Sequence, residues 1–336
     1  MDDEIRIPRF HLVLQSEFPI NALILATEAL RIANQNSGRQ LFEWSLVSAD
    51  GEDVRASNGM WLSVDESLEE LTAADYCFVF DGNLPTTNKS AQLLAKLREL
   101  HRQGTTLVGI DTGGFALTEA DVTSAAVVVH WEAASTYQEH FSRMPVGDQL
   151  YQIDASIISC AGGVATLDLM LELIKRHYDE LLSIEVANAL VHPIRDARQP
   201  QRALVPHLNE KRSFSDRLVT LLENHLDFPL SVSEIASRLS VSTSTLERHC
   251  HRHFSCSPMQ LYLGLRLQGA RNYLFYEDSS IKEVSIAFGF SSPGVFSRTF
   301  KHYFGLTPSD FRRSIREKQV GTRLPEISRL YTSRSH

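Results

Sequence analysis

One short segment of the sequence has the residue types and spacing for covalent chemistry at a strand-to-helix turn. In residues 106–115, TLVGIDTGGF, an apolar run ends at Asp111, with Gly109 and Gly113 on either side. A G-x-nucleophile-x-G pattern is typical of a tight turn that lifts its central side chain out of a sheet. Backbone N–H groups at the start of the following helix could stabilise an oxyanion. His130, at the end of the next apolar run, could act as a general base.

The side chain at the centre of this turn argues against such catalysis. Asp111 carries a carboxylate, which an oxyanion would repel, and it is neither a thiol nor a hydroxyl. We therefore predict that the chain has no catalytic residues and is not an enzyme. Carboxylate nucleophiles do exist in enzymes, so an enzyme that uses Asp111 and His130 remains the alternative.

The same turn is also a candidate binding site for a small molecule. Carboxylates beside aromatic rings favour a cationic ligand, because cation–π attraction contributes on the order of 0.5–2 kcal/mol per aromatic contact. Trp131 and Phe115 are the nearby aromatic residues, and packing in the core is their alternative role. Glu28 could instead face solvent or cap a helix. The predicted ligand-binding residues are Glu28, Asp111, Thr112, His130, Trp131 and Glu132.

The elements expected around this turn alternate between strand and helix. Continuous Val-, Ile- and Phe-rich runs predict strands that are buried on both faces, and amphipathic spacing predicts the helices between them. This order predicts a flavodoxin-like, doubly wound α/β sandwich, in which ligands bind beyond the carboxyl ends of the strands. The predicted strands are 10–14, 43–48, 76–80, 106–110 and 126–129, and the predicted helices are 20–34, 90–103, 114–120, 133–141 and 163–177.

Residues 213–313 have helical periodicity throughout and contain an internal repeat of 49–50 residues. Each copy predicts a short helix, a tight turn and a longer helix, which is the helix-turn-helix arrangement that reads DNA. Gly289 suits the second turn because glycine tolerates positive φ, and Ser240 holds the same position in the first turn. Residues 259–275 predict a connecting helix of about 25 Å. Such a helix could place two recognition helices about one DNA turn apart, roughly 34 Å.

The longer helix of each copy supplies the predicted DNA contacts. Arg248 and Arg298 are the best candidates for base reading, since arginine can bind guanine bidentately for about 1–3 kcal/mol. Lys301, His249 and Arg252 are expected to contact phosphates instead. For the residues other than arginine, a solvated helix face is the alternative. The predicted DNA-binding residues are Thr243, Ser244, Glu247, Arg248, Pro293, Gly294, Ser297, Arg298 and Lys301.

This all-α repeat resembles the DNA-binding domain of the AraC/XylS family. The resemblance covers roughly residues 213–313 and implies a transcriptional regulator, with activation of catabolic genes as the expected role. It rests on an ordered series of residues: Ile235, Ala236, Leu246, Arg248, Ser257, Pro258, Arg266, Leu267, Ala270, Arg271, Ile281, Val284, Gly289, Phe290, Phe296, Arg298, Phe300, Lys301, Phe304, Gly305, Pro308, Phe311 and Arg312.

The first half looks like the class I glutamine amidotransferase-like (PfpI-like) domain found at the front of certain AraC-type regulators. In enzymes of that superfamily a cysteine lies where this sequence has Asp111, and their supporting acidic residue would fall near Ala22. The resemblance therefore implies a non-catalytic domain that dimerises and senses a small amine or amino acid, cationic or zwitterionic, such as arginine, glycine betaine or carnitine. The matching stretches are 18–34, 109–115, 130–132, 160–163 and 168–171.

Charge is distributed unevenly along the chain. The formal net charge is −8, but residues 1–200 contain 29 acidic and 14 basic side chains, whereas residues 201–336 contain 12 acidic and 19 basic. Halves of opposite sign suggest two domains with different partners. We predict a ligand-sensing and dimerisation domain at 8–196, a linker at 197–212, a DNA-binding domain at 213–318 and a tail at 319–336.

The remaining features concern the cellular setting and metals. Four cysteines are too few for a disulfide scaffold, no apolar run approaches the ~18 residues of a membrane span, and the first ten residues lack the apolar region of a secretory signal. We expect a cytoplasmic homodimer that binds double-stranded promoter DNA and a small-molecule effector, with no membrane partner and no cofactor. The His- and Cys-rich run 249–256 invites a zinc interpretation, but its members point in different directions on one helix, so no metal site is predicted.

Overall fold

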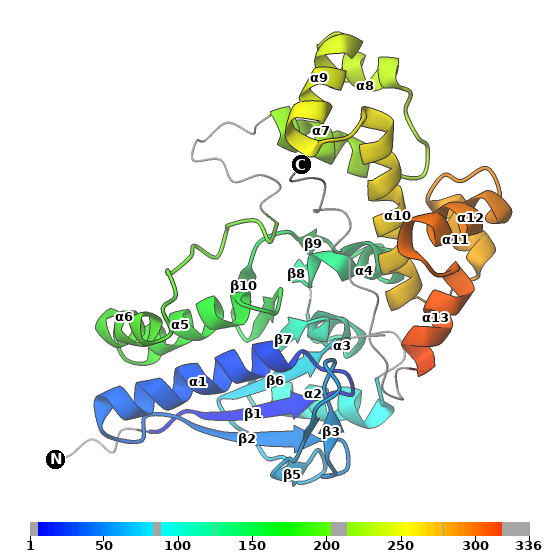
Figure 1. The fold of residues 1–336 in the computed structure, drawn as a ribbon. Coiled ribbons are helices and arrows are strands. Elements are labelled where there is room, and N and C mark those ends of the chain that lie inside the picture. Colours follow the sequence, from blue (N-terminus) through cyan, green and yellow to red (C-terminus); the bar gives the residue numbers. More distant parts are fainter. Residues whose placement is uncertain (1–5, 83–88, 124, 203–213, 278, 318–336) are drawn as a thin grey trace. The chain divides into compact units, whose positions relative to one another are not determined.

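The computed structural model describes residues 6–82, 89–123, 125–202, 214–277 and 279–317 (Figure 1). The chain divides into two compact units, residues 1–202 and residues 203–336, and each is described by itself. The first is a mixed α/β unit and the second is helical, which confirms the predicted fold class.

A seven-stranded sheet forms the centre of the first unit, in the order β10-β11-β7-β6-β1-β2-β5. All neighbouring strands are parallel except β10 and β11, which pair antiparallel at one edge. The central strands carry near-continuous apolar sequence because both faces of the sheet are covered. The strands are β1 (Arg9–Leu14), β2 (Glu43–Ser48), β5 (Glu66–Ser67), β6 (Tyr76–Asp81), β7 (Thr106–Asp111), β10 (Tyr151–Asp154) and β11 (Ile157–Cys160).

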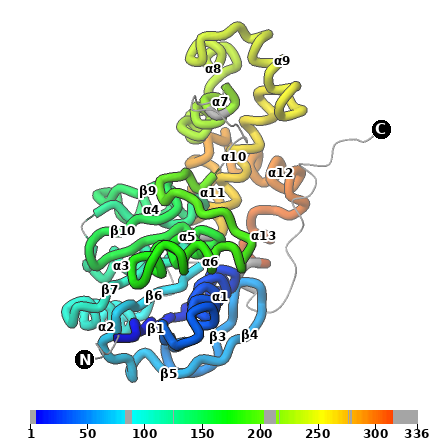
Figure 2. The backbone as a smooth tube through the Cα atoms, turned by 90° about the vertical axis from the view of Figure 1, so that its left-hand side faces the viewer, coloured from blue at the N-terminus to red at the C-terminus, as the bar shows by residue number. Residues whose placement is uncertain are grey.

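Helices cover both faces of this sheet. On one face α1 (Ile20–Ser37), α5 (Ala165–His177) and α6 (Glu180–Ala189) pack on side chains such as Phe10, Phe78 and Ile110 (Figures 1 and 2). On the other face α2 (Ala91–Arg102) and α3 (Gly113–Glu119) pack on the alternate side chains, among them Val79 and Leu107. Alternation of side chains along each strand thus gives two cores, one on each side of the sheet.

The edge of the sheet differs from the sequence prediction. The predicted strand 126–129 is instead β8 (Val127–Val128), which pairs with β9 (Val146–Gly147) outside the main sheet. Strands β10 and β11 were not predicted, because two four-residue strands are too short for a clear periodic signal. The other small elements are β3 (Val54–Arg55) paired with β4 (Trp61–Leu62), the short 3₁₀ turn Trp131–Ala133, and α4 (Ala134–His140).

Residues 197–202, predicted as the start of the linker, pack against the first unit. The Leu150 N–H donates to the Ala197 carbonyl at 2.9 Å, and the Gln201 N–H donates to the Asp148 carbonyl at 2.9 Å. Residues 203–212 of the predicted linker and the predicted tail from 319 lie outside the described residues.

The described part of the second unit consists of helices arranged around two small cores. Leu222, Ile235, Leu246 and Tyr262 belong to the first core, and the second is mainly aromatic. The long helix α10 contributes to both cores, so it joins the two halves of the unit. The helices are α7 (Phe214–Glu223), α8 (Val232–Arg238), α9 (Thr243–Phe254), α10 (Pro258–Tyr276), α11 (Ile281–Ala287), α12 (Pro293–Phe304) and α13 (Pro308–Glu317).

Local sequence signals explain where these helices begin. Ser231, Ser257 and Ser280 each cap a helix, and each forms a capping box with the Glu or Gln three residues later. In this arrangement two otherwise unsatisfied backbone N–H groups are bound reciprocally. Helix α10 spans 19 residues, which corresponds to about 28 Å at 1.5 Å per residue.

Candidate functional site

The residues predicted to contact DNA lie on the outer faces of α9 and α12. The inner faces of the same helices carry Leu246 and Cys250, and Phe296 and Phe300, all of which are fully buried. Burial of these four side chains fixes the orientation of each helix on its core. The exposed predicted residues are Thr243, Ser244, Glu247, Arg248, Pro293, Gly294, Arg298 and Lys301, and Ser297 is half-buried.

Both helix-turn-helix units turn through a left-handed residue at the predicted place. Ser240 has φ +57° and Gly289 has φ +67°, which confirms that they are equivalent positions. After each turn a serine caps the recognition helix: Ser242 Oγ accepts from the Thr245 N–H at 3.2 Å, and Ser292 Oγ accepts from the Val295 N–H at 3.3 Å. These caps satisfy N–H groups that the first helical turn leaves without a partner.

Arg266 of α10 fixes the second turn from inside the unit. Its Nε donates to the Phe288 carbonyl at 2.8 Å and its Nη2 donates to the Gly289 carbonyl at 2.5 Å. The guanidinium also lies 4.4 Å from the centre of the Phe290 ring, and its burial lowers the pKa of Arg266. This arginine belongs to the motif that suggested DNA binding, yet its contacts are internal.

His249, which the sequence predicts to contact a phosphate, makes several contacts within the protein. Its Nε2 lies 2.8 Å from Ser215 Oγ on α7, and its ring packs edge-on against Phe214 with centroids 4.5 Å apart. The ring also stacks on His253 at 4.3 Å. Burial, together with His253 and Arg252, lowers the pKa of His249. The packed imidazole helps to orient α9, and its lowered pKa weakens the attraction that it could offer to a phosphate.

In the first unit, the turn at Asp111 has the geometry that its glycine spacing predicted. Asp111 ends β7 with φ +62°, a strained conformation for a residue other than glycine. A Cβ on Gly109 would lie 2.7 Å from the Gly114 nitrogen, and a Cβ on Gly113 would collide with the Val79 carbonyl oxygen. Glycine is therefore required at both flanking positions for the strand to enter α3 so abruptly.

Acidic side chains surround this turn. Asp111 is partly exposed and pairs in register with Asp81 on the neighbouring strand β6. Desolvation by the surrounding protein raises the pKa of Asp111 well above its usual value, and the charges of Asp81 and Glu132 raise it further. Gly162 closes the other side, where an added Cβ would lie 2.8 Å from the Asp111 Cβ. Asp81 and Gly162 were not among the predicted site residues.

The predicted residues 130–132 do come to the turn. The His130 N–H donates to the Asp111 carbonyl at 3.1 Å, and His130 Nδ1 lies 4.0 Å from a Glu132 carboxylate oxygen. Burial lowers the pKa of His130 although Glu132 opposes this shift. Trp131 is partly exposed and lies 4.6 Å below the Arg202 guanidinium. Part of its cation–π capacity is thus already used within the protein.

Known proteins share both halves of this arrangement. Residues 235–314 match the family model described as a helix-turn-helix domain. The chain is 36% identical over 308 residues to the HTH-type transcriptional regulator CdhR of Pseudomonas aeruginosa, an alignment that covers 90% of this chain and 91% of that protein. A crystal structure of an AraC family transcriptional regulator from Pseudomonas putida aligns with a TM-score of 0.50 at 25% identity, over 55% of this chain and 99% of that chain.

The chain belongs to the AraC family of helix-turn-helix transcriptional regulators. A crystal structure of a ThiJ/PfpI family protein from Pseudomonas syringae, 12% identical with a TM-score of 0.51, covers 70% of this chain and 91% of that one. At this identity the likeness concerns the fold alone, and it agrees with the amidotransferase-like fold of the first unit. No helix in the described segments of this regulator is long and apolar enough to span a membrane.

The regulator lacks a reactive thiol at its turn. The cysteine nearest in the fold, Cys160 at the end of β11, is fully buried, and burial raises its pKa to about 12. A thiol with so high a pKa remains protonated near neutral pH and is a poor nucleophile.

Two of the predicted ligand residues are engaged elsewhere. Asn21, at the start of α1, approaches Gly163 near the turn. Glu28 lies seven residues further along this helix, which places it about 10 Å farther from the turn along the helix axis. Both Glu28 carboxylate oxygens accept from Arg31, at 2.8 Å each, and this contact lowers the pKa of Glu28. Thr112 is fully buried, and its hydroxyl donates to the Gly82 carbonyl at 2.8 Å.

A buried cation near the turn was missed by sequence reasoning. The Lys89 side chain is 3% exposed and its Nζ lies 2.8 Å from a Glu119 carboxylate oxygen. The same Nζ lies 4.9 Å from the centre of the Phe115 ring. Phe115 is fully buried, which agrees with core packing, the alternative role given for this residue in the sequence analysis. Burial lowers the pKa of Lys89, and Glu119 and Asp81 oppose this. A single lysine in the polar stretch 86–90 gives no sequence signal of such a role.

Proposed function

We propose that this AraC-family regulator binds promoter DNA through the outer faces of α9 and α12. The observation that supports this most directly is that Arg248 and Arg298 are exposed on helices whose opposite faces are buried. A bidentate arginine–guanine contact discriminates bases, whereas Lys301 would contribute a phosphate contact. The basic second half of the sequence favours attraction to the duplex.

We further propose that the acidic turn of the first unit binds a small amine effector. Three carboxylates, Asp81, Asp111 and Glu132, converge there, and the raised pKa of Asp111 reflects the unfavourable free energy of ionising it. A cationic ligand would relieve that repulsion by pairing with the ionised carboxylate. Candidate effectors are cationic or zwitterionic amines, such as L-arginine, glycine betaine or L-carnitine.

The pH dependence of amine binding tests this site. Because the Asp111 pKa is raised, its carboxyl loses its proton at a higher pH than usual, and a cationic ligand favours the ionised form, so the affinity should increase as the pH rises through this transition. Loss of the proton from His130 acts in the same direction, while Lys89 and Arg202 are nearby cations that oppose binding. Calorimetry of the full chain with L-arginine measures this dependence.

Two variants control that measurement. Asp111→Asn keeps a residue type that tolerates the left-handed turn and should remove most of the pH dependence together with the affinity. Asp154→Asn makes the same change at an exposed position of β10 and should alter neither. Tighter binding of an anion than of any amine would contradict the proposed effector class.

The enzyme alternative is separable from the regulator by experiment. We propose that the chain is not an enzyme, since the turn carries Asp111 and the cysteine nearest in the fold is buried. Turnover of amides or aldehydes that Asp111→Ala abolishes would support the alternative instead. Transcriptional activation, rather than repression, is the proposed outcome of effector binding, and reporter transcription with and without the amine would measure it.

The first unit is also the proposed dimerisation unit, and a cytoplasmic location follows from a role on chromosomal DNA. Leu181 and Ile184 of α6 are 65% and 40% exposed, on the same helix as the exposed polar residues Glu180, Glu185 and Asn188. Large apolar side chains that are exposed together on a surface rimmed by polar residues can mark an interface with another protein chain. Light scattering of the full chain should therefore give a dimer, and Leu181→Asp should shift it toward monomer; an unchanged dimer would place the interface elsewhere.

The most informative single experiment is DNA binding of the full chain as a function of salt, with and without L-arginine, glycine betaine and L-carnitine. The slope of the logarithm of the affinity against the logarithm of the salt concentration reports phosphate contacts. A shift of the curve on addition of an amine reports the effector. Equal affinity for selected and scrambled DNA would contradict sequence-specific regulation.

A further inference from the structure

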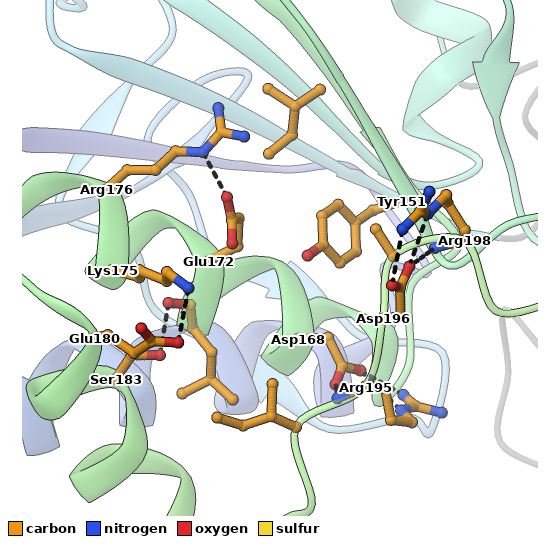
Figure 3. Close-up of a pocket in the computed structure, with 14 residues that line it drawn as sticks. Tyr151, Asp168, Glu172, Lys175, Arg176, Glu180, Ser183, Arg195, Asp196 and Arg198 are labelled. Carbon is orange, nitrogen blue, oxygen red and sulfur yellow. Dashed lines mark hydrogen bonds and ion pairs between the residues drawn. The ribbon is translucent and has the colours of Figure 1, made fainter.

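A cleft of the first unit lies away from the acidic turn. It has a volume of about 420 Å³ and is formed by β10, α5, the start of α6 and the segment 194–198 (Figure 3). Sites for small molecules typically measure about 300–1,000 Å³, so the space is sufficient for a small metabolite. The lining residues all fall between 151 and 198, whereas the acidic turn is built from residues 81, 111 and 130–132.

The charges around this cleft are balanced and paired. Arg176 donates to Glu172 at 2.7 Å, Lys175 donates to Glu180 at 2.8 Å, and Arg195 binds Asp168, whose side chain is fully buried. Figure 3 shows these pairs at different places around the opening. A lining that presents both signs gives no net attraction to a simple cation or anion, but it complements a ligand that carries both charges.

Tyr151 gives the cleft a directional polar group. The residue is 8% exposed, its hydroxyl points into the cleft in Figure 3, and no hydrogen bond to it occurs within the described segments. Burial raises the pKa of Tyr151, and the charges of Glu172 and Asp168 raise it further. The hydroxyl thus lies within range of the Glu172 and Asp168 carboxylates, with Arg176 opposing them, and beside its own aromatic ring; oxygen acceptors and a ring face suit an ammonium group.

The opposite group on the ligand would face Arg195. Asp168 accepts from Arg195 Nε at 3.0 Å and from Nη2 at 2.5 Å. A guanidinium has five N–H donors, so this pair leaves donors for a carboxylate. The lining also includes Ile153, Leu171 and Ile194, which can accept an aliphatic side chain.

We propose that this cleft binds an α-amino acid with an aliphatic side chain, with its ammonium group between Tyr151 and Glu172 and its carboxylate toward Arg195. This site is additional to the proposed effector site at Asp111. Its wall at 194–198 runs directly into residues 201–202, where Gln201 binds the Val129 carbonyl and Arg202 covers Trp131. The bound amino acid thus contacts the chain segment that also covers the edge of the acidic turn.

Calorimetry of the full chain with L-leucine, and with two analogues that each lack one of its charged groups, tests the proposal. L-Leucine should bind saturably, whereas 3-methylbutylamine, which lacks the carboxylate, and 4-methylpentanoate, which lacks the amine, should bind at least about tenfold more weakly, a difference of about 1.4 kcal/mol. Glycine, which lacks the aliphatic side chain, should also bind more weakly.

Variants locate the binding. Tyr151→Phe and Glu172→Gln should each weaken L-leucine binding by about tenfold, while Glu185→Gln, the same change at an exposed position of α6, should have no effect. Asp111→Asn should leave L-leucine binding unchanged, and Tyr151→Phe should leave binding of L-arginine at the acidic turn unchanged. Failure of L-leucine to bind, affinity unaffected by Tyr151→Phe and Glu172→Gln, or loss of binding in Asp111→Asn would each overturn the proposal.

Discussion

The two helix-turn-helix units share one plan but differ in what holds them and in what they expose. The first packs mainly aliphatic side chains around Leu246 and turns at Ser240. The second packs a cluster of phenylalanines around Phe296, turns at Gly289 and is fixed by Arg266. The second helix-turn-helix is therefore the more tightly constrained of the two.

The exposed faces of the two recognition helices also differ: the first helix-turn-helix, which is less tightly constrained, presents more hydrogen-bonding side chains. The start of α9 presents Thr243, Ser244 and Arg248, all of which carry hydrogen-bonding side chains, whereas α12 begins with Pro293 and Gly294, which carry none. Sequence reading requires side-chain donors and acceptors at base edges. We propose that the first helix-turn-helix reads bases and that the second mainly positions the domain, with Arg298 as its base-reading candidate.

The largest expected effect is that of Gly289→Ala on stability. A Cβ at this position would lie 2.6 Å from the Asp227 carbonyl oxygen and 2.7 Å from Pro229 Cδ, at φ +67°. Strain of this kind costs on the order of 3 kcal/mol, which urea unfolding of the full chain would measure. Gly294→Ala is the control, since the nearest atom to an added Cβ there is 4.0 Å away. Equal losses of stability in both variants would contradict a specific requirement for glycine at the Gly289 turn.

The next effect concerns the fixing of the second turn. Arg266→Ala removes two hydrogen bonds to backbone carbonyls and the contact with Phe290, so we expect a loss of about 2 kcal/mol in the free energy of unfolding. Lys282→Ala, an exposed change on α11, should be near neutral. If Arg266→Ala weakened DNA binding without any loss of stability, Arg266 would contact DNA and the internal role would be wrong.

Substitutions of Arg248 and Lys301 test whether the first helix-turn-helix reads bases while the second contacts phosphates. Arg248→Ala should weaken binding to an operator selected by the full chain by about 1–3 kcal/mol, with a much smaller effect on scrambled DNA. Lys301→Ala should weaken binding to both DNAs similarly and reduce the salt slope by about 1. Fluorescence anisotropy measures the affinities and the salt slope. An equal loss of affinity on the two DNAs for Arg248→Ala would refute base reading by the first helix-turn-helix.

The smallest effect is at the first turn. Ser240 adopts φ +57°, and glycine accepts this conformation without the steric cost of a Cβ, so Ser240→Gly should raise stability by about 0.5–1 kcal/mol. Ser237→Gly, an exposed change inside α8, should lower it by about 0.5 kcal/mol. A decrease for Ser240→Gly in thermal unfolding would mean that the serine side chain makes a compensating contact.

Much of the second unit was predictable because its signals are local. Helix starts follow from Ser-x-x-Glu or Ser-x-x-Gln spacing, the buried faces follow from helical periodicity, and the turns follow from Gly289 and its counterpart Ser240. What could not be predicted is that His249 binds Ser215 and that Arg266 points inward. Both depend on which helix lies beside which.

In the first unit, the sequence by itself determined the alternation of strands and helices and the tight turn at Asp111, since glycines at 109 and 113 allow that turn and few other residues would. Only the tertiary structure decided what surrounds Asp111. Asp81, Glu132, Lys89 and Gly162 come from four separate segments that meet at the ends of parallel strands, and Glu28 is held on α1 by Arg31. Periodicity and turn residues act over a few positions, whereas electrostatics depends on distances in space between residues far apart in the chain.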